Sequence, residues 1–77
     1  MKIFADFNNA DAKGRIRLNT KGSLRDIEEA GINLQPGQEI VLSDNDEFET
    51  LGLVEFSIEE QIWVAKIDWD MLTKNLK

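Results

Sequence analysis

Five short stretches of this chain alternate between apolar and polar residues, and this alternation constrains the fold more than any other feature. A period of two places successive side chains on opposite faces of a β-strand. Turn-forming residues such as Gly, Asn, Asp and Pro separate the stretches. The predicted strands span residues 2–7, 15–19, 38–43, 48–57 and 62–69.

This pattern predicts a mainly β fold: a small five-stranded antiparallel barrel, formed by residues 1–77 as a single domain. The first two strands are expected to pair as a hairpin with a long loop, because turn-forming residues join them directly. The side chains predicted to face the core are Ile3, Phe7, Ile16, Leu18, Ile40, Leu42, Val54, Phe56, Trp63, Ile67 and Trp69.

A short helix is predicted between the second and third strands, over residues 24–30. Leu24 and Ile27 form an apolar stripe with helical spacing, and Ser23 stands where a capping side chain would be needed. Gly31 provides a stop for the helix. Two turns of helix are stable only when packed against other elements, so we expect this helix to lie at one end of the barrel.

The chain is short, and its composition excludes several classes of protein. With 77 residues, no cysteine and no histidine, it has no disulfide, no thiolate metal site and none of the usual nucleophile–base pairs. We therefore expect no cofactor, no metal and no catalytic role. A charged residue follows the N-terminus too early for a signal peptide, and no apolar run is long enough for a membrane span, so we expect a cytoplasmic protein.

Charges are strongly segregated along the chain. The stretch from Asp26 to Ala65 contains eleven carboxylates and no Lys or Arg, whereas residues 1–25 contain six basic and two acidic residues. The whole chain has a formal net charge of −6. Segregation of this kind determines which partners are attracted, and it does not determine the fold.

The half of the chain from Leu34 to Ala65 resembles the small SH3-like barrels found in translation and transcription proteins. The resemblance lies in the segment Leu34-Gln35-Pro36-Gly37-Gln38-Glu39-Ile40-Val41-Leu42, the later Gly52-Leu53-Val54 and the final Trp63-Val64-Ala65. It implies a barrel with a Pro-Gly turn before an inward-facing strand. The nucleic-acid-binding proteins of that group are basic, whereas the matching half here is acidic, so the resemblance implies a fold and no activity.

Arg15 and Arg17 alternate with apolar residues on the second strand and form a short basic strip that could contact nucleic acid. The net negative charge and the lack of an aromatic stacking surface oppose this interpretation. The alternative is that both arginines balance acidic strands within the molecule. We expect nucleic-acid binding to be weak.

A second candidate surface is apolar. If the alternation holds through the fourth and fifth strands, one outward face carries Leu51, Leu53, Ile62 and Val64. An exposed apolar face on a small barrel is typical of a protein interface. The alternative is that a C-terminal helix, capped by Asp68 or Asp70, covers this face through Leu72 and Leu76.

The acidic turn from Asp44 to Glu49 resembles a calcium loop only superficially, because it lacks the glycine that such a loop needs at its sixth position. Paired carboxylates remain a third, enzymatic, possibility. The leading hypothesis is a small acidic, non-catalytic binding or regulatory module. Its partner is a protein or a second copy of the chain, with Glu55 or Glu60 near the Arg15 or Arg17 of the other copy.

Overall fold

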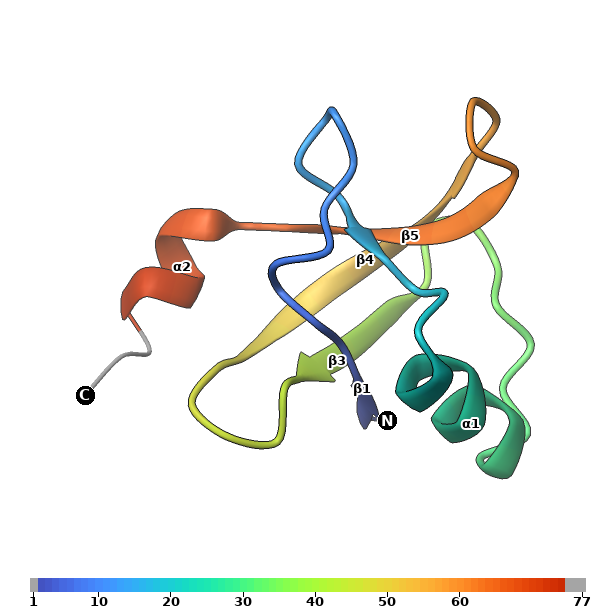
Figure 1. Ribbon diagram of the computed structural model, residues 1–77, viewed down its shortest axis with the longest axis horizontal. Coiled ribbons are helices and arrows are strands. Elements are labelled where there is room, and N and C mark those ends of the chain that lie inside the picture. Colours follow the sequence, from blue (N-terminus) through green and yellow to red (C-terminus); the bar gives the residue numbers. More distant parts are fainter. Residues whose placement is uncertain (1, 75–77) are drawn as a thin grey trace.

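The computed structural model describes residues 2–74, and the side chains of residues 2–72 (Figure 1). The predicted helix residue Leu76 lies outside the described part. The elements in chain order are β1 (Lys2–Phe4), β2 (Ile16–Arg17), α1 (Lys21–Glu29), β3 (Glu39–Ser43), β4 (Glu49–Ser57), β5 (Ile62–Ile67) and α2 (Trp69–Lys74).

The five strands form one curled sheet, a half-barrel, in the order β1-β3-β4-β5-β2. Strands β3, β4 and β5 form an antiparallel meander, and β2 adds to β5 in the antiparallel sense. The prediction of a mainly β, barrel-like domain with five strands is therefore confirmed. The prediction of a purely antiparallel sheet is wrong, because β1 runs parallel to β3.

The predicted hairpin between the first two strands does not form, because β1 and β2 lie at opposite edges of the sheet. The chain crosses from one edge to the other between them (Figure 1). It then folds back over a short distance, where Ala10 bridges Ile16 and the Arg17 amide donates to the Asn9 carbonyl at 2.9 Å. The N-terminal segment thus contacts both edges, which limits the exposed strand edge available for aggregation.

Helix α1 begins one turn earlier than predicted and packs on β1 rather than across an end of the sheet. Its N-cap is Thr20, whose hydroxyl accepts from the Ser23 amide at 3.0 Å. Ser23, the predicted cap, bonds to β1 instead, and so does Asp26. The Phe4 amide donates to Asp26 Oδ2 at 2.8 Å, and Ser23 Oγ donates to the Phe4 carbonyl at 2.7 Å. These bonds satisfy the backbone amide and carbonyl of Phe4, which lie on the free edge of β1.

Most of the residues predicted to face the core are buried in the structure. Two predicted core residues, Phe56 and Trp69, are exposed, and Phe7 and Trp63 are only partly buried. Trp69 is the first residue of α2, and its indole N–H donates to the Gly14 carbonyl at 2.9 Å, outside the sheet. The buried apolar residues are Ile3, Ala5, Ile16, Leu18, Ile40, Leu42, Val54, Val64, Ala65, Ile67 and Leu72.

Candidate functional site

The basic strip predicted from Arg15 and Arg17 is built into the molecule by ion pairs. Arg15 Nε donates to Asp11 Oδ2 at 2.9 Å, and its Nη1 donates to Glu55 Oε1 at 3.0 Å. The side chains of Arg15 and Asp11 are only 11% and 5% exposed. Asp11 Oδ1 also accepts from the Lys13 and Arg15 amides. Arg15 therefore holds the loop before β2 against β4.

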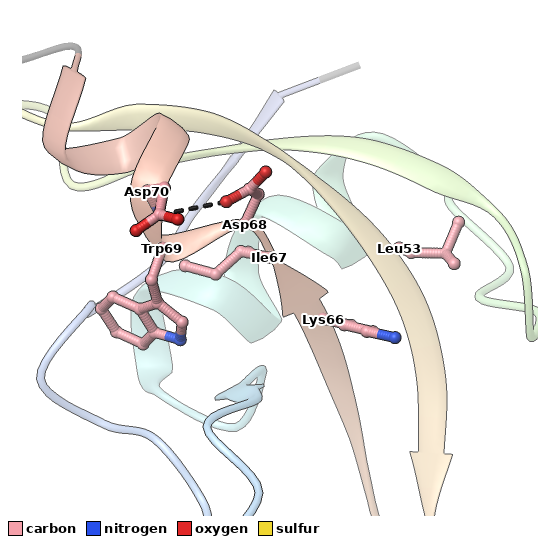
Figure 2. Close-up of a pocket in the computed structure, with 6 residues that line it drawn as sticks. All are labelled: Leu53, Lys66, Ile67, Asp68, Trp69 and Asp70. Atoms are coloured by element: carbon pink, nitrogen blue, oxygen red, sulfur yellow. Dashed lines mark hydrogen bonds between the residues drawn. The ribbon is translucent and has the colours of Figure 1, made fainter.

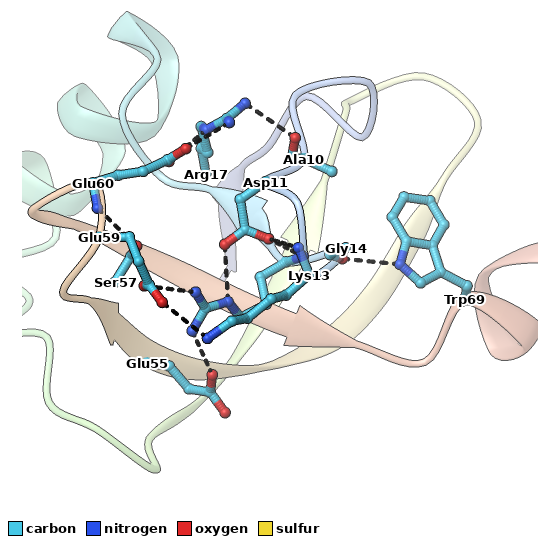
Figure 3. Close-up of polar contacts among 11 residues, drawn as sticks. Ala10, Asp11, Lys13, Gly14, Arg17, Glu55, Ser57, Glu59, Glu60 and Trp69 are labelled. Carbon is cyan, nitrogen blue, oxygen red and sulfur yellow. Dashed lines mark hydrogen bonds and ion pairs between the residues drawn. The ribbon is translucent and has the colours of Figure 1, made fainter.

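Arg17 makes a bidentate pair with Glu60, from Nε to Oε1 at 2.7 Å and from Nη2 to Oε2 at 2.8 Å. Its Nη1 donates to Asn9 Oδ1 and to the Ala10 carbonyl, and Figure 3 shows the second of these bonds. These bonds use the planar fork of the guanidinium, a geometry that favours carboxylates. The guanidinium groups of Arg15 and Arg17 are thus both bonded to carboxylates of the same chain.

A third pair joins the same loops: Lys13 Nζ lies 3.1 Å from Glu59 Oε2. We call this set the ion-pair network. It contains three cations and four carboxylates, so it is close to neutral. Its members are Asp11, Lys13, Arg15, Arg17, Glu55, Glu59 and Glu60.

The ion-pair network shifts the acidity of its members. Burial tends to raise the pKa of Asp11, but the hydrogen bonds from the Arg15 amide and side chain and from the Lys13 amide outweigh it and hold this pKa below its ordinary value of 3.8. The hydrogen bond from Arg17 lowers the pKa of Glu60 in the same way. These shifts favour the charged forms of Asp11 and Glu60, so neither carboxylate is poised for proton transfer at neutral pH.

The apolar face predicted from β4 and β5 does not form one surface. Val64 is 0% exposed, because the register places it between Glu55 on β4 and Arg17 on β2, beneath the ion-pair network. Its assignment as an interface residue is corrected. Leu51 and Leu53 are exposed. Ile62 pairs with Ser57, six residues along β4 from Leu51, which is about 20 Å of strand.

Ile62 instead lines an apolar groove between α1 and β5. The groove has a volume of about 560 Å³, within the range of small-molecule and side-chain binding sites. No charged residue lines it, and carboxamides supply its polar groups. The lining residues are Leu18, Asn19, Leu24, Ile27, Ile32, Asn33, Leu34, Gln61, Ile62 and Trp63.

Local sequence explains why this groove is open. Leu24 and Ile27 lie three residues apart on α1 and share a face. The extended segment after the helix carries Ile32 and Leu34, which alternate with polar residues and therefore present their side chains on one side. Leu24 remains 53% exposed, since no other element of the described chain covers this side of α1. The helix, the segment and β5 thus form three apolar walls.

The apolar surface continues beyond the groove along the β4–β5 hairpin. Phe56 packs edge-on against Trp63 with a ring-centroid distance of 5.1 Å. Ile58, in the turn that follows, is 76% exposed. Sequence reasoning missed this site because it assigned Phe56 and Trp63 to the core. The apolar alternation at Ile32 and Leu34, in a segment without a predicted partner, was the signal available.

A second hollow, of about 520 Å³, lies beside the start of α2. Figure 2 shows its lining, in which Asp68, Trp69 and Asp70 gather at the start of α2 while Leu53 and Lys66 lie apart from them. The polar groups here include both signs of charge, and Asp68 Oδ1 accepts from the Asp70 amide at the start of the helix. Since these carboxylates begin α2, we assign this hollow a structural role.

Among the described residues, no group of three or more His, Cys, Asp or Glu side chains is arranged to hold a metal ion. Neither α1 nor α2, in the described part of the chain, is long and apolar enough to cross a bilayer. The chain matches no protein-family profile, no curated protein sequence and no solved structure.

Proposed function

We propose that this protein is a small, non-catalytic binding module that contacts a protein partner through the apolar groove between α1 and β5. The observation that carries this proposal is the groove itself: seven apolar side chains line it, and no charge does. Grooves of this kind take aliphatic or aromatic anchor residues of a bound segment. The carboxamides of Asn19, Asn33 and Gln61 supply both donors and acceptors for a peptide backbone.

The alternative functions have less support. A nucleic-acid role rests on Arg15 and Arg17, whose guanidinium groups are already bonded to carboxylates. We expect a Kd weaker than about 10⁻⁴ M for DNA or RNA at physiological salt. A carboxylate enzyme needs a group with a raised pKa, whereas the resolved shifts of Asp11, Asp44, Glu59 and Glu60 are all downward.

Two further parts of the proposal concern fold type and location. We assign the half-barrel to the SH3-like type, on the strength of the Pro36-Gly37 turn before β3 and the meander that follows it. We place the protein in the cytoplasm, consistent with a chain that has no cysteine to form disulfides.

The test is selection from a random peptide library displayed on phage, with the full chain as bait. Peptides enriched on the wild type are then measured against two variants by fluorescence polarisation. Leu24→Asp places a charge in the groove, whereas Leu51→Asp places the same charge on an equally exposed leucine of β4, since both are 53% exposed. We expect Leu24→Asp to weaken binding at least about tenfold and Leu51→Asp to change it less than twofold.

Two outcomes would contradict the proposal. One is a library that yields no enriched peptide, and the other is a set of peptides that bind Leu24→Asp as well as wild type. Self-association is checked separately by sedimentation velocity in low and high salt. A dimer that Leu24→Asp dissociates would identify a second copy of the chain as the partner.

A further inference from the structure

Helix α1 carries its charges in the order opposite to the one that stabilises a helix. Lys21 is its first residue, and Glu28 and Glu29 are its last two. Its first turn contains no acidic residue and its last turn no basic residue. Because the N-terminus of a helix has partial positive charge and the C-terminus partial negative charge, each of these three residues is unfavourably placed.

Nothing in the described part of the chain compensates this arrangement. Lys21, Glu28 and Glu29 are exposed, and no ion pair within residues 2–72 includes them. The charges of the ion-pair network, by contrast, are paired within the chain. A local arrangement that costs stability without a structural gain is typical of a functional site.

Two of these charges lie next to a residue that lines the groove. Residues three and four apart on a helix are neighbours on one face, so Lys21 and Glu28 flank Leu24 on either side. Leu24 lines the groove. Lys21 and Glu28 are seven positions apart, which is about 10 Å along the helix axis and the length of three residues of an extended peptide. The groove is thus apolar in its lining, and on its α1 side the lining residue Leu24 lies between a positive and a negative charge.

We infer that the groove binds a peptide segment of a partner protein in which an apolar stretch has an acidic residue at the Lys21 end and a basic residue at the Glu28 end. This inference rests on the proposed function and adds the charge pattern of the partner. The apolar side chains enter the groove and supply the burial, while the two terminal charges fix the direction of the segment. A segment with the reverse charge order meets like charges at both ends, so the site rejects it.

The experiment exchanges the two charges in the double variant Lys21→Glu/Glu28→Lys. The net charge stays at −6, so long-range attraction is unchanged. The new order favours the helix dipole, so the variant is expected to melt at or above the temperature of the wild type. Loss of binding then cannot result from loss of folding. The control is the exchange Lys66→Glu/Glu39→Lys, which is also neutral overall and involves two exposed residues outside the groove lining.

Peptides selected on the wild type are expected to bind the Lys21→Glu/Glu28→Lys variant about three- to twentyfold more weakly, the range for two exposed ion pairs. Synthetic versions of these peptides with their two terminal charges exchanged should bind this variant as tightly as the original peptides bind the wild type. The control exchange should alter binding less than twofold.

The result that overturns the inference is equal binding by the wild type and the Lys21→Glu/Glu28→Lys variant. If Leu24→Asp still abolishes that binding, the proposed function stands and the charge pattern alone is wrong. If Leu24→Asp has no effect either, the groove is not the binding site and both proposals fail.

Discussion

The ion-pair network and the apolar groove lie on either side of β5. They differ in how far their side chains already have partners within the chain. In the network, the donors of Arg15 and Arg17 are bonded to carboxylates and carbonyls of the same molecule. In the groove, Leu24 is 53% exposed and Trp63 is only partly buried. The charged region is therefore closed, and the apolar region is open.

This difference is the opposite of what the residue types suggest about which region binds a partner. Clustered arginines on a strand are typical of a binding surface, but here they hold the loop from Asp11 to Arg15 and the β4–β5 turn together. The apolar side chains, which normally form the core, are the ones left with unfilled surface. A side chain is available to a partner when its own chain leaves its polar groups without hydrogen bonds or its apolar surface exposed. Four predictions test this distinction between the two regions.

The largest expected effect is at Val64, which underlies the ion-pair network. Val64→Asp places a carboxylate at a position that is 0% exposed, and we expect a loss of at least about 3 kcal/mol in the free energy of unfolding. A domain of this size has little more than that to lose. Urea denaturation followed by tryptophan fluorescence measures the loss. Leu51→Asp is the matched control. If Val64→Asp lowers the free energy of unfolding no more than Leu51→Asp does, the buried position of Val64 is contradicted.

Asp11 should show the next largest effect. Asp11→Ala removes the acceptor of two backbone amides and of Arg15 Nε. Because these groups are largely shielded from water, we expect the free energy of unfolding to fall by about 1–3 kcal/mol. Chemical denaturation checks this value. A change below about 0.5 kcal/mol would mean that the ion-pair network does not hold the loop in place.

A smaller loss of stability is expected at acidic pH. The pKa values of Asp11, Asp44, Glu59 and Glu60 lie below their ordinary values of 3.8 and 4.5 in the folded protein. Their contribution to stability is therefore complete above the ordinary values and is lost as the pH falls through the lowered ones. The melting temperature should stay level from pH 7 to about pH 5 and decline below it. Asp11→Asn should flatten that decline.

The smallest effect on stability is expected in the groove. Leu24→Asp changes a half-exposed residue in the first part of α1, where a carboxylate is favourable to the helix dipole. The free energy of unfolding should change by less than about 1 kcal/mol, although peptide binding is lost. Thermal unfolding by circular dichroism measures this. Destabilisation as large as that of Val64→Asp would show that Leu24 belongs to the core.

Sequence reasoning recovered the strands and most of the core, because period-two alternation is a local property of each segment. It located α1 to within one turn and left the cap of α2 open between Asp68 and Asp70. The structure shows Asp68 in that role, since its Oδ1 accepts from the Asp70 and Met71 amides. It failed for Phe56 and Trp69, where alternation or apolar character suggested burial but the side chains are 39% and 41% exposed. The candidate site was predicted only in part, since Ile62 lines the groove and Val64 does not.

The sequence by itself determined the number of strands, the segregation of charge and the lack of histidine and cysteine chemistry, since each depends on residue type and short-range spacing. Only the tertiary structure decided which strands pair, which charges meet and which apolar surface stays open. Arg15 and Glu55 are 40 residues apart in the chain, and β1 reaches β3 in parallel only because the chain crosses the sheet. Contacts at such separations depend on the packing of the whole chain, which no local pattern encodes.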